Sequence, residues 1–184
     1  MKKTLFYFAT MAAMTGITGT ATAAGTLGTY DVQVSATVIE SSTCVVNAPS
    51  SLVFDNIKAD QVMDVVKGPA HAQVYLIQMS GCRQGQHVSA TVEGTADANN
   101  SQLLSTESDS GQAAKNVALA FFEQVGNNLH PLVPINTGST TSRMINELGQ
   151  AQIAIQTDVV LSDNTKPALS GTIAANANVA INFL

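Results

Sequence analysis

Charged and aromatic residues are scarce in this chain of 184 residues. Only 11% of the residues are charged, 5% are aromatic, and tryptophan is absent. The formal net charge is -5 and the sequence holds no basic cluster, so nucleic acid and anionic membrane surfaces are not expected as partners. A surface without tryptophan also lacks the stacking rings that are common in sugar-binding sites, which argues against a carbohydrate site.

Long hydrophobic runs are missing beyond the start of the chain, so no later stretch is expected to span a bilayer. The start has the pattern of a secretory signal peptide. Two lysines at positions 2 and 3 precede an apolar run over residues 5–17 and an A-x-A cleavage sequence that ends at Ala23. We therefore predict that residues 1–23 are a signal peptide, that the exported chain begins at Ala24, and that no part of it inserts directly into a membrane.

Cysteine is used only twice, at Cys44 and Cys82. In an exported protein an isolated pair of this kind predicts one disulfide. A metal site is the alternative. It is disfavoured because neither cysteine belongs to a C-x-x-C pair, and because His71 and His87 lack the spacing of metal ligands.

Sequence patterns of catalytic and metal sites are absent as well. The sequence contains neither G-x-S-x-G nor a calcium loop of the type D-x-D-x-D-G. Its histidines, His71, His87 and His130, are scattered over predicted strands and loops. Most acidic residues fall in predicted loops, where turn formation and solvation account for them. We expect neither enzymatic activity nor a cofactor or metal.

Alternation of apolar and polar residues is the clearest feature that is present. Over residues 30–39 the apolar side chains recur at every second position, which predicts a β-strand with one buried face. The preceding residues 25–29 are short and contain two glycines, so they cannot supply a partner strand. This strand must therefore pair with a distant part of the chain or with another molecule.

Further short strands are expected at spacings set by turn residues. The predicted strands lie at residues 52–54, 71–80, 88–92, 116–125, 129–133 and 150–161. Residues 45–46 are expected to complete the first strand, and residues 74–77, apolar on both faces, to lie at the centre of a sandwich. A hairpin turn is predicted at residues 126–128, with Pro131 placing the returning strand at an edge.

Three stretches are expected to be loops. Residues 58–67 are expected to have little regular structure, residues 95–114 to be an exposed connection, and residues 136–143 to be a polar loop. The sequence then ends in a strand over residues 172–184, in which apolar residues alternate without a break. Seven or eight short strands separated by turns predict an all-β sandwich of immunoglobulin type.

In combination these features resemble the pilin subunits of chaperone–usher fimbriae, and the type 1-like major subunits most. The resemblance is carried by the alternating extension before Cys44, the segment Ser80-Gly81-Cys82, the pattern Val117-x-Leu119-x-Phe121 with its Gly126-Asn127-Asn128 turn, and the terminal strand from Gly171 to Leu184. Phe183 stands where the family usually has tyrosine. Ala36 stands where it usually has glycine, and Ala154-Ile155-Gln156 replaces an Ala-Arg-Tyr-like segment.

The resemblance implies an incomplete immunoglobulin-like sandwich whose missing strand leaves an apolar groove beside the terminal strand. A periplasmic chaperone lends a strand to this groove, and at the outer-membrane usher the N-terminal extension of the next subunit replaces it. Such β-strand addition derives affinity from main-chain hydrogen bonds and specificity from alternate side chains. The implied product is an adhesive pilus on the cell surface, reached through the periplasm.

Applied to this chain, the resemblance implies an N-terminal donor-strand extension at residues 24–40 and a pilin domain at residues 41–184. The side chains inserted into a neighbouring subunit would be Tyr30, Val32, Val34, Ala36 and Val38. The receiving groove, which also binds the chaperone, would be lined by Ile173, Ala175, Ala177, Val179, Ile181 and Phe183.

Two alternatives to a polymerising structural subunit are considered. One is a minor adaptor or terminator subunit of the same fibre, although a terminator would lack either the extension or the groove. The other is a free-standing secreted sandwich that binds a ligand, in which residues 30–39 would be an ordinary first strand.

Overall fold

The computed structural model of the chain describes residues 30–39, 44–54, 56–107, 113–125 and 131–184. The predicted signal peptide and the predicted turn at residues 126–128 lie outside the described residues. The described part is all-β apart from two single-turn 3-10 helices, η1 (Ala59–Gln61) and η2 (Val65–Lys67). No helix in it is long and apolar enough to cross a membrane.

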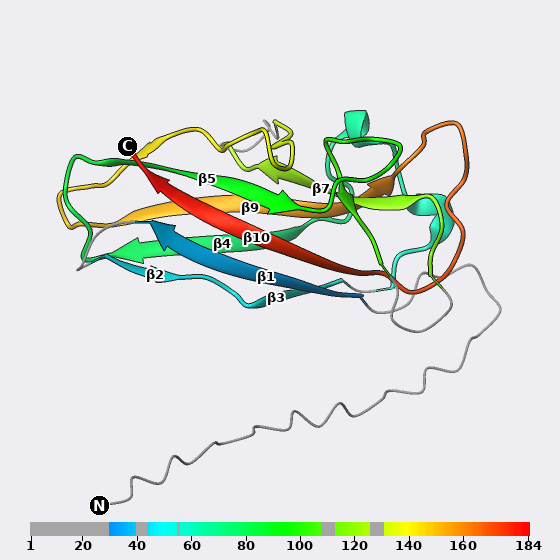
Figure 1. Cartoon of the computed structure of the whole chain (residues 1–184), viewed down its shortest axis with the longest axis horizontal. Coiled ribbons are helices and arrows are strands. Elements are labelled where there is room, and N and C mark those ends of the chain that lie inside the picture. The colour runs from blue at the N-terminus through cyan, green and yellow to red at the C-terminus, as the bar shows by residue number, and fades with distance from the viewer. Residues whose placement is uncertain (1–29, 40–43, 55, 108–112, 126–130) are drawn as a thin grey trace, which may run out of the picture.

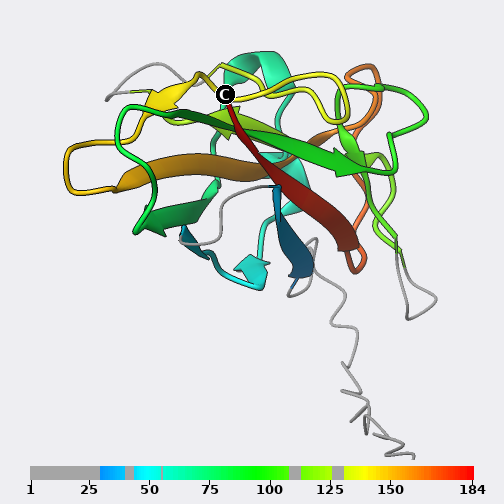
Figure 2. The same ribbon diagram turned by 60° about the vertical axis from the view of Figure 1, so that its left-hand side comes forward.

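Two five-stranded sheets face each other in a β-sandwich (Figures 1 and 2). The first sheet has the order β3 (Ser51–Phe54), β1 (Tyr30–Ile39), β10 (Ala174–Phe183), β5 (His87–Gly94), β8 (Arg143–Met144). The second sheet has the order β2 (Val45–Asn47), β4 (Gln73–Ser80), β9 (Ala151–Leu161), β7 (Val117–Glu123), β6 (Leu104–Ser105). This arrangement confirms the predicted sandwich of immunoglobulin type.

The core lies between the two sheets, where the alternation of each strand points its apolar side chains. Its largest fully buried members include Phe54 on β3, Tyr75 and Ile77 on β4, Leu119 on β7 and Ile153 on β9. Each fully buried aliphatic or aromatic side chain stabilises the fold by about 1.5–3 kcal/mol relative to an exposed one. The sandwich is therefore held mainly by this layer.

The prediction for residues 74–77 was wrong in one respect. Tyr75 and Ile77 are buried, but Val74 is 45% exposed. Nothing in the described residues buries the outer face of β4 at Val74. The strand therefore has one buried face rather than two.

The prediction for residues 45–46 was also wrong. These residues belong to β2, a separate strand in the second sheet, where Val45 pairs with Ser80 on β4. The disulfide between Cys44 and Cys82 explains this position, because it joins the start of β2 to the residues that follow β4. The chain thus crosses from the first sheet to the second between β1 and β2.

The connection at residues 95–114 is not fully exposed as predicted. It contains β6, and both Leu103 and Leu104 are buried, at 0% and 1% exposure. Leu104 joins the main core, whereas Leu103 joins a second cluster with Phe122 and Val160. Every residue of β7 is buried, so its outer face also requires an apolar cover. Likewise, the loop predicted to end at Arg143 ends in the short strand β8.

Asp158 on β9 is a buried carboxylate, 1% exposed, that anchors the chain segment before β4. It accepts hydrogen bonds from the backbone N–H groups of Ala70 at 2.6 Å, of His71 at 3.2 Å and of Val159 at 2.8 Å. Burial raises the pKa of Asp158 above the ordinary value despite these bonds.

A raised pKa in the folded state means that ionisation of Asp158 opposes folding. The protonated Asp158 side chain contributes its full stabilisation at pH values below the pKa that this group has in the unfolded chain. That stabilisation is lost as pH rises through the pKa that the group has in the folded protein. We therefore expect the free energy of unfolding of the native protein, measured relative to Asp158→Asn, to increase as pH is lowered from 7 toward 4. Urea denaturation of both proteins across this range measures the difference. A pH-independent difference would contradict the assignment.

Candidate assembly site

The strand β1 lies between β3 and β10 inside the first sheet (Figure 1). We call the space between β3 and β10 the slot. Beside β10 the pairing runs from Asp31↔Ala174 to Ile39↔Asn182, and β1 is parallel to β10. Beside β3 the pairing is antiparallel. The contact of β1 with β10 is the only parallel pairing between named strands in the described part of the chain.

Two side chains of β1 are buried in the core. Val32 is 0% exposed and Val34 is 5% exposed, whereas Gln33 between them is exposed. For the predicted donor residues Tyr30, Ala36 and Val38, only the backbone register is described. Tyr30 lies opposite Phe54 on β3. Ala36 lies opposite Val179 on β10, and Val38 lies opposite Ile181. The alternation predicted from the sequence is present where it is described.

The side chains that β10 presents to the slot change in size along the strand. The predicted groove residues Ile173, Ala175, Ala177, Val179 and Ile181 are all buried, and Phe183 is partly buried against the same core. By register, Val32 lies opposite Ala175, and Val34 lies opposite Ala177. Small residues on β10 therefore leave room for the two valines of β1. Further along, register pairs the smaller Ala36 with the larger Val179.

The other wall of the slot is β3, which the sequence did not identify. Leu52 and Phe54 on this strand are buried at 7% and 1% exposure. Leu52 pairs directly with Val32, and the Val34 N–H donates to the Ser50 carbonyl at 3.1 Å. Residues 52–54 were predicted to be a strand from their composition, but no pattern in them indicated which strand lies beside them.

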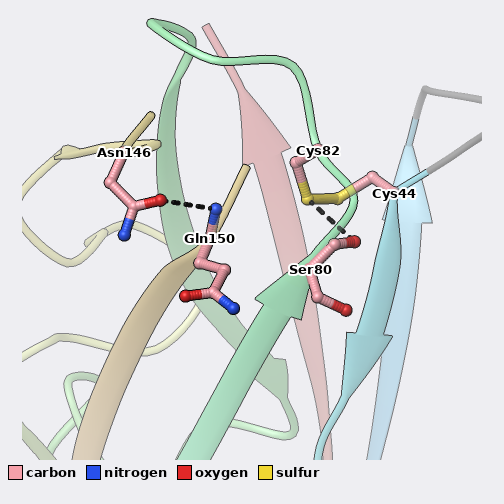
Figure 3. Close-up of a disulfide and its surroundings, with 5 residues drawn as sticks. All are labelled: Cys44, Ser80, Cys82, Asn146 and Gln150. Atoms are coloured by element: carbon pink, nitrogen blue, oxygen red, sulfur yellow. Dashed lines mark hydrogen bonds between the residues drawn. A yellow bond between two sulfur atoms is a disulfide. The ribbon is translucent and has the colours of Figure 1, made fainter. Parts of the chain in front are cut away.

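The disulfide between Cys44 and Cys82 is present, so the alternative of a metal site at these cysteines is wrong. Figure 3 shows that it lies beside the turn between Asn146 and Gln150. The Cys82 N–H donates to the Gly149 carbonyl at 3.0 Å. Gly149 has φ of +70°, and a Cβ there would lie 2.7 Å from the Cys82 carbonyl oxygen. A side chain would thus disturb this contact.

The described residues contain no group of three or more His, Cys, Asp or Glu side chains that could hold a metal ion. His71 and His87 lie on separate segments, and His130 is outside the described residues. A polar cavity of about 350 Å³ lies between residues 64–65, 99–100 and 161–164. Its side chains largely bond to one another, as Asn164 does to Asp64 at 2.9 Å. None of the predicted site residues lines it.

Comparison with models of protein families gives a match over most of the chain. The model of a protein family described as "Fimbrial protein" matches residues 32–183. The structure of the antigen and type I fimbria protein BPSL1626 from Burkholderia pseudomallei is similar, with a TM-score of 0.51, 20% identity, and coverage of 86% of this chain and 97% of that one. This similarity supports the pilin-type sandwich.

Two further solved structures are similar at lower scores. The P pilus rod subunit PapA has a TM-score of 0.47 and 16% identity over 78% of this chain and all of that chain. The CupB6 tip adhesin from Pseudomonas aeruginosa has a TM-score of 0.48 and 8% identity over 77% of this chain and 43% of that chain. No curated protein sequence matches at a significant level.

Proposed function

Because the chain belongs to the fimbrial protein family, whose members are structural pilus subunits rather than enzymes, we propose that it polymerises by exchanging β1 between copies. The observation that supports this most is the position of β1. It fills the slot between β3 and β10 as the first strand of the domain, and β3 is held in the sheet by its pairing with β1, whereas the remaining strands pair among themselves. A β1 strand from another copy could therefore occupy the slot and pair with both β10 and β3, while the ladders among the remaining strands stay in place.

The slot offers an inserted strand a long ladder and two apolar positions. Nine residues of β1 pair with β10 and four pair with β3. Burial of Val32 and Val34 adds roughly 1.5–3 kcal/mol for each side chain. In β-strand addition the ladder supplies affinity and the alternate side chains supply specificity. Exchange of β1 would thus join two copies by a link that dissociates slowly.

The direction of insertion decides whether a fibre can grow. The chain leaves β1 at Ile39 and enters the domain at Cys44, so a donor domain must lie close to the end of the slot at which its residue 39 emerges. A strand inserted parallel to β10 would emerge at the Phe183 end. The acceptor's own extension joins its domain at this same end. An antiparallel strand would emerge at the opposite end, near Ala174, and copies could then stack head to tail without limit.

We therefore infer that β1 is parallel to β10 within one chain and antiparallel to it between copies. Antiparallel pairing is slightly more stable per residue than parallel pairing. Reversal would make the nine pairs with β10 antiparallel and the four pairs with β3 parallel, so the larger number of pairs favours the exchanged state. A periplasmic chaperone that holds the slot until the outer-membrane usher is reached would keep β1 from closing its own slot. The fibre would then be displayed on the cell surface after passage through the periplasm.

A structural position along the fibre is favoured over a terminator, because the chain has both a β1 strand and a slot. The residues assigned to donation and reception stay as proposed: Tyr30, Val32, Val34, Ala36 and Val38 on the donor, and Ile173 to Phe183 on the acceptor. A minor adaptor would carry the same two features. The free-standing binding module lacks support from any particular surface of the described residues.

Strand exchange predicts that a domain starting at Ser41 is strongly destabilised and that a peptide copying residues 29–40 restores its stability. A rise in melting temperature on adding the peptide, with slow release, is the expected result. A spin label on the first residue of the peptide tests direction. In the antiparallel arrangement it broadens amide signals near Phe183, and in the parallel arrangement it broadens those near Ala174.

The control is a peptide of the same composition with its alternation scrambled, which should neither stabilise the domain nor remain bound. A domain starting at Ser41 that is as stable as the longer chain, and indifferent to both peptides, would refute strand exchange. That outcome would favour the free-standing sandwich.

A further inference from the structure

Exposed apolar side chains gather at the end of the sandwich that holds the disulfide, where Val45, next to Cys44, is 62% exposed. Met144, Leu148 and Leu184 are 63%, 77% and 73% exposed. We call these three residues the end patch. Single exposed apolar residues are ordinary on protein surfaces. A binding role for these three residues must therefore be argued from their arrangement and from the residues near them.

Met144 and Leu184 lie on one side of the first sheet, on either side of His87. The Leu184 N–H donates to the His87 carbonyl at 2.8 Å, and His87 pairs with Met144 across β5 and β8. Directly opposed residues on neighbouring strands place their side chains on the same face. The two apolar side chains therefore belong to one continuous strip of surface.

Leu148 is tied to the point where the extension joins the domain. It lies in the turn between Asn146 and Gln150, and the carbonyl of the next residue, Gly149, accepts the Cys82 N–H. Cys82 is bonded to Cys44, the first described residue after β1 (Figure 3). The end patch thus belongs to the end of the domain from which the extension leaves, at the left of Figure 1.

The short connection between β1 and the domain limits how far apart two joined copies can be. Four residues separate Ile39 from Cys44, so their Cα atoms are at most about 17 Å apart when the segment is fully extended. After antiparallel exchange, Cys44 of the donor lies within this distance of the acceptor slot near Ala174. The end of the donor that carries the end patch then lies close to that end of the acceptor.

The facing end of the acceptor carries a complementary surface. Leu169 is 52% exposed, and its backbone is bonded in both directions to Lys115, with N···O distances of 3.0 and 3.2 Å. Lys115 is also exposed. On the donor, exposed Glu147 stands next to Leu148. Neither Glu147 nor Lys115 forms an ion pair with another residue in the described part of the chain.

We propose that the end patch is an interface between consecutive copies in the fibre, with Leu148 packing against Leu169 of the preceding copy and Glu147 facing its Lys115. This inference rests on the proposed antiparallel exchange. It assigns to the end patch a role in chain growth separate from that of the slot. The slot joins copies, and the end patch holds their domains in one relative orientation.

The test compares two reactions of the exported full-length chain. The first is insertion of the peptide of residues 29–40, which uses the slot alone. The second is polymerisation, followed by detergent-resistant ladders, which also requires the domains to approach. We expect Leu148→Asp to slow polymerisation about tenfold and to leave peptide insertion unchanged. Val74→Asp, which changes an exposed valine on the outer face of β4, is the matched control and should polymerise normally.

Charge reversal makes the test specific. Glu147→Lys or Lys115→Glu alone places like charges opposite each other, and each should slow polymerisation about threefold at low salt. The double variant restores opposite charges and should return to within about twofold of the native rate. Native-like polymerisation of Leu148→Asp, or failure of the double variant to recover, would overturn the interface. Failure of both the native chain and the domain starting at Ser41 to bind the peptide would instead overturn strand exchange itself.

Discussion

Replacing Val32 by aspartate is expected to remove most of the stability of the domain. Val32 is 0% exposed between β3 and β10. The substitution forfeits about 1.5–3 kcal/mol of apolar burial and adds the cost of placing a carboxyl group without partners in the core, about 1–3 kcal/mol from mutational data and more if it stays charged. A loss above about 4 kcal/mol is a large part of the 5–15 kcal/mol typical of a domain. Urea denaturation of the exported chain measures it.

The neighbouring position provides the matched control. Gln33 lies on the same strand but is exposed, so Gln33→Asp should change the free energy of unfolding by no more than about 0.5 kcal/mol. Equal stability of Val32→Asp and Gln33→Asp would contradict the placement of β1.

Adding the native peptide of residues 29–40 to Val32→Asp separates the slot from the strand. Recovery of stability would locate the defect in the strand and show that the slot accepts a replacement from outside. Without recovery, the placement of β1 within its own chain would stand, and the exchange of β1 between copies would not.

The faces of the two strands at the slot could be predicted from the sequence, but their pairing could not. The bounds of β1 coincide with the alternating stretch at residues 30–39, and β10 lies within the predicted residues 172–184. An alternation of period two looks the same from either end. It therefore identifies a buried face and leaves open both the partner strand and the direction of pairing. For this reason the parallel pairing of β1 with β10 of the same chain could not be predicted from the sequence.

Very short elements account for most of the remaining differences. β6 and β8 have two residues each, and β2 has three. Such lengths are too short for a periodic pattern, which needs about four to eight residues. Leu103 and Leu104 also stand in a polar segment. Leu103 is buried with Phe122 on the outer face of β7, and Leu104 is buried in the main core, so the burial of both depends on residues outside their own segment. Likewise, Leu52 and Phe54 form a wall of the slot only because β1 pairs with them.

Removal of the disulfide by the double substitution Cys44→Ser and Cys82→Ser is expected to cost about 4 kcal/mol. The two residues are separated by 38 positions, and closing a loop of that size restricts the unfolded chain by about this amount in the chain-entropy model. Replacing both cysteines avoids a free thiol. Denaturation in urea should show a lower midpoint for the variant, and the native protein in reducing buffer should shift to the same value. Coincident midpoints for all three samples would contradict a stabilising role.

The disulfide is also expected to change how the protein extends under mechanical tension, because of its position between Cys44 and Cys82. In a fibre joined by β1, tension reaches each domain through Cys44, and β2 is held to β4 by only three register pairs, from Val45↔Ser80 to Asn47↔Gln78. The disulfide transfers that tension directly to Cys82 at the end of β4, a strand inside the second sheet. In single-molecule pulling of joined copies, the oxidised protein should therefore separate by release of β1 from the slot. The cysteine-free variant should first lengthen by unravelling from β2, at lower force. If both proteins lengthened in the same steps, β2 alone would be a sufficient anchor, and the disulfide would act on the unfolded chain only.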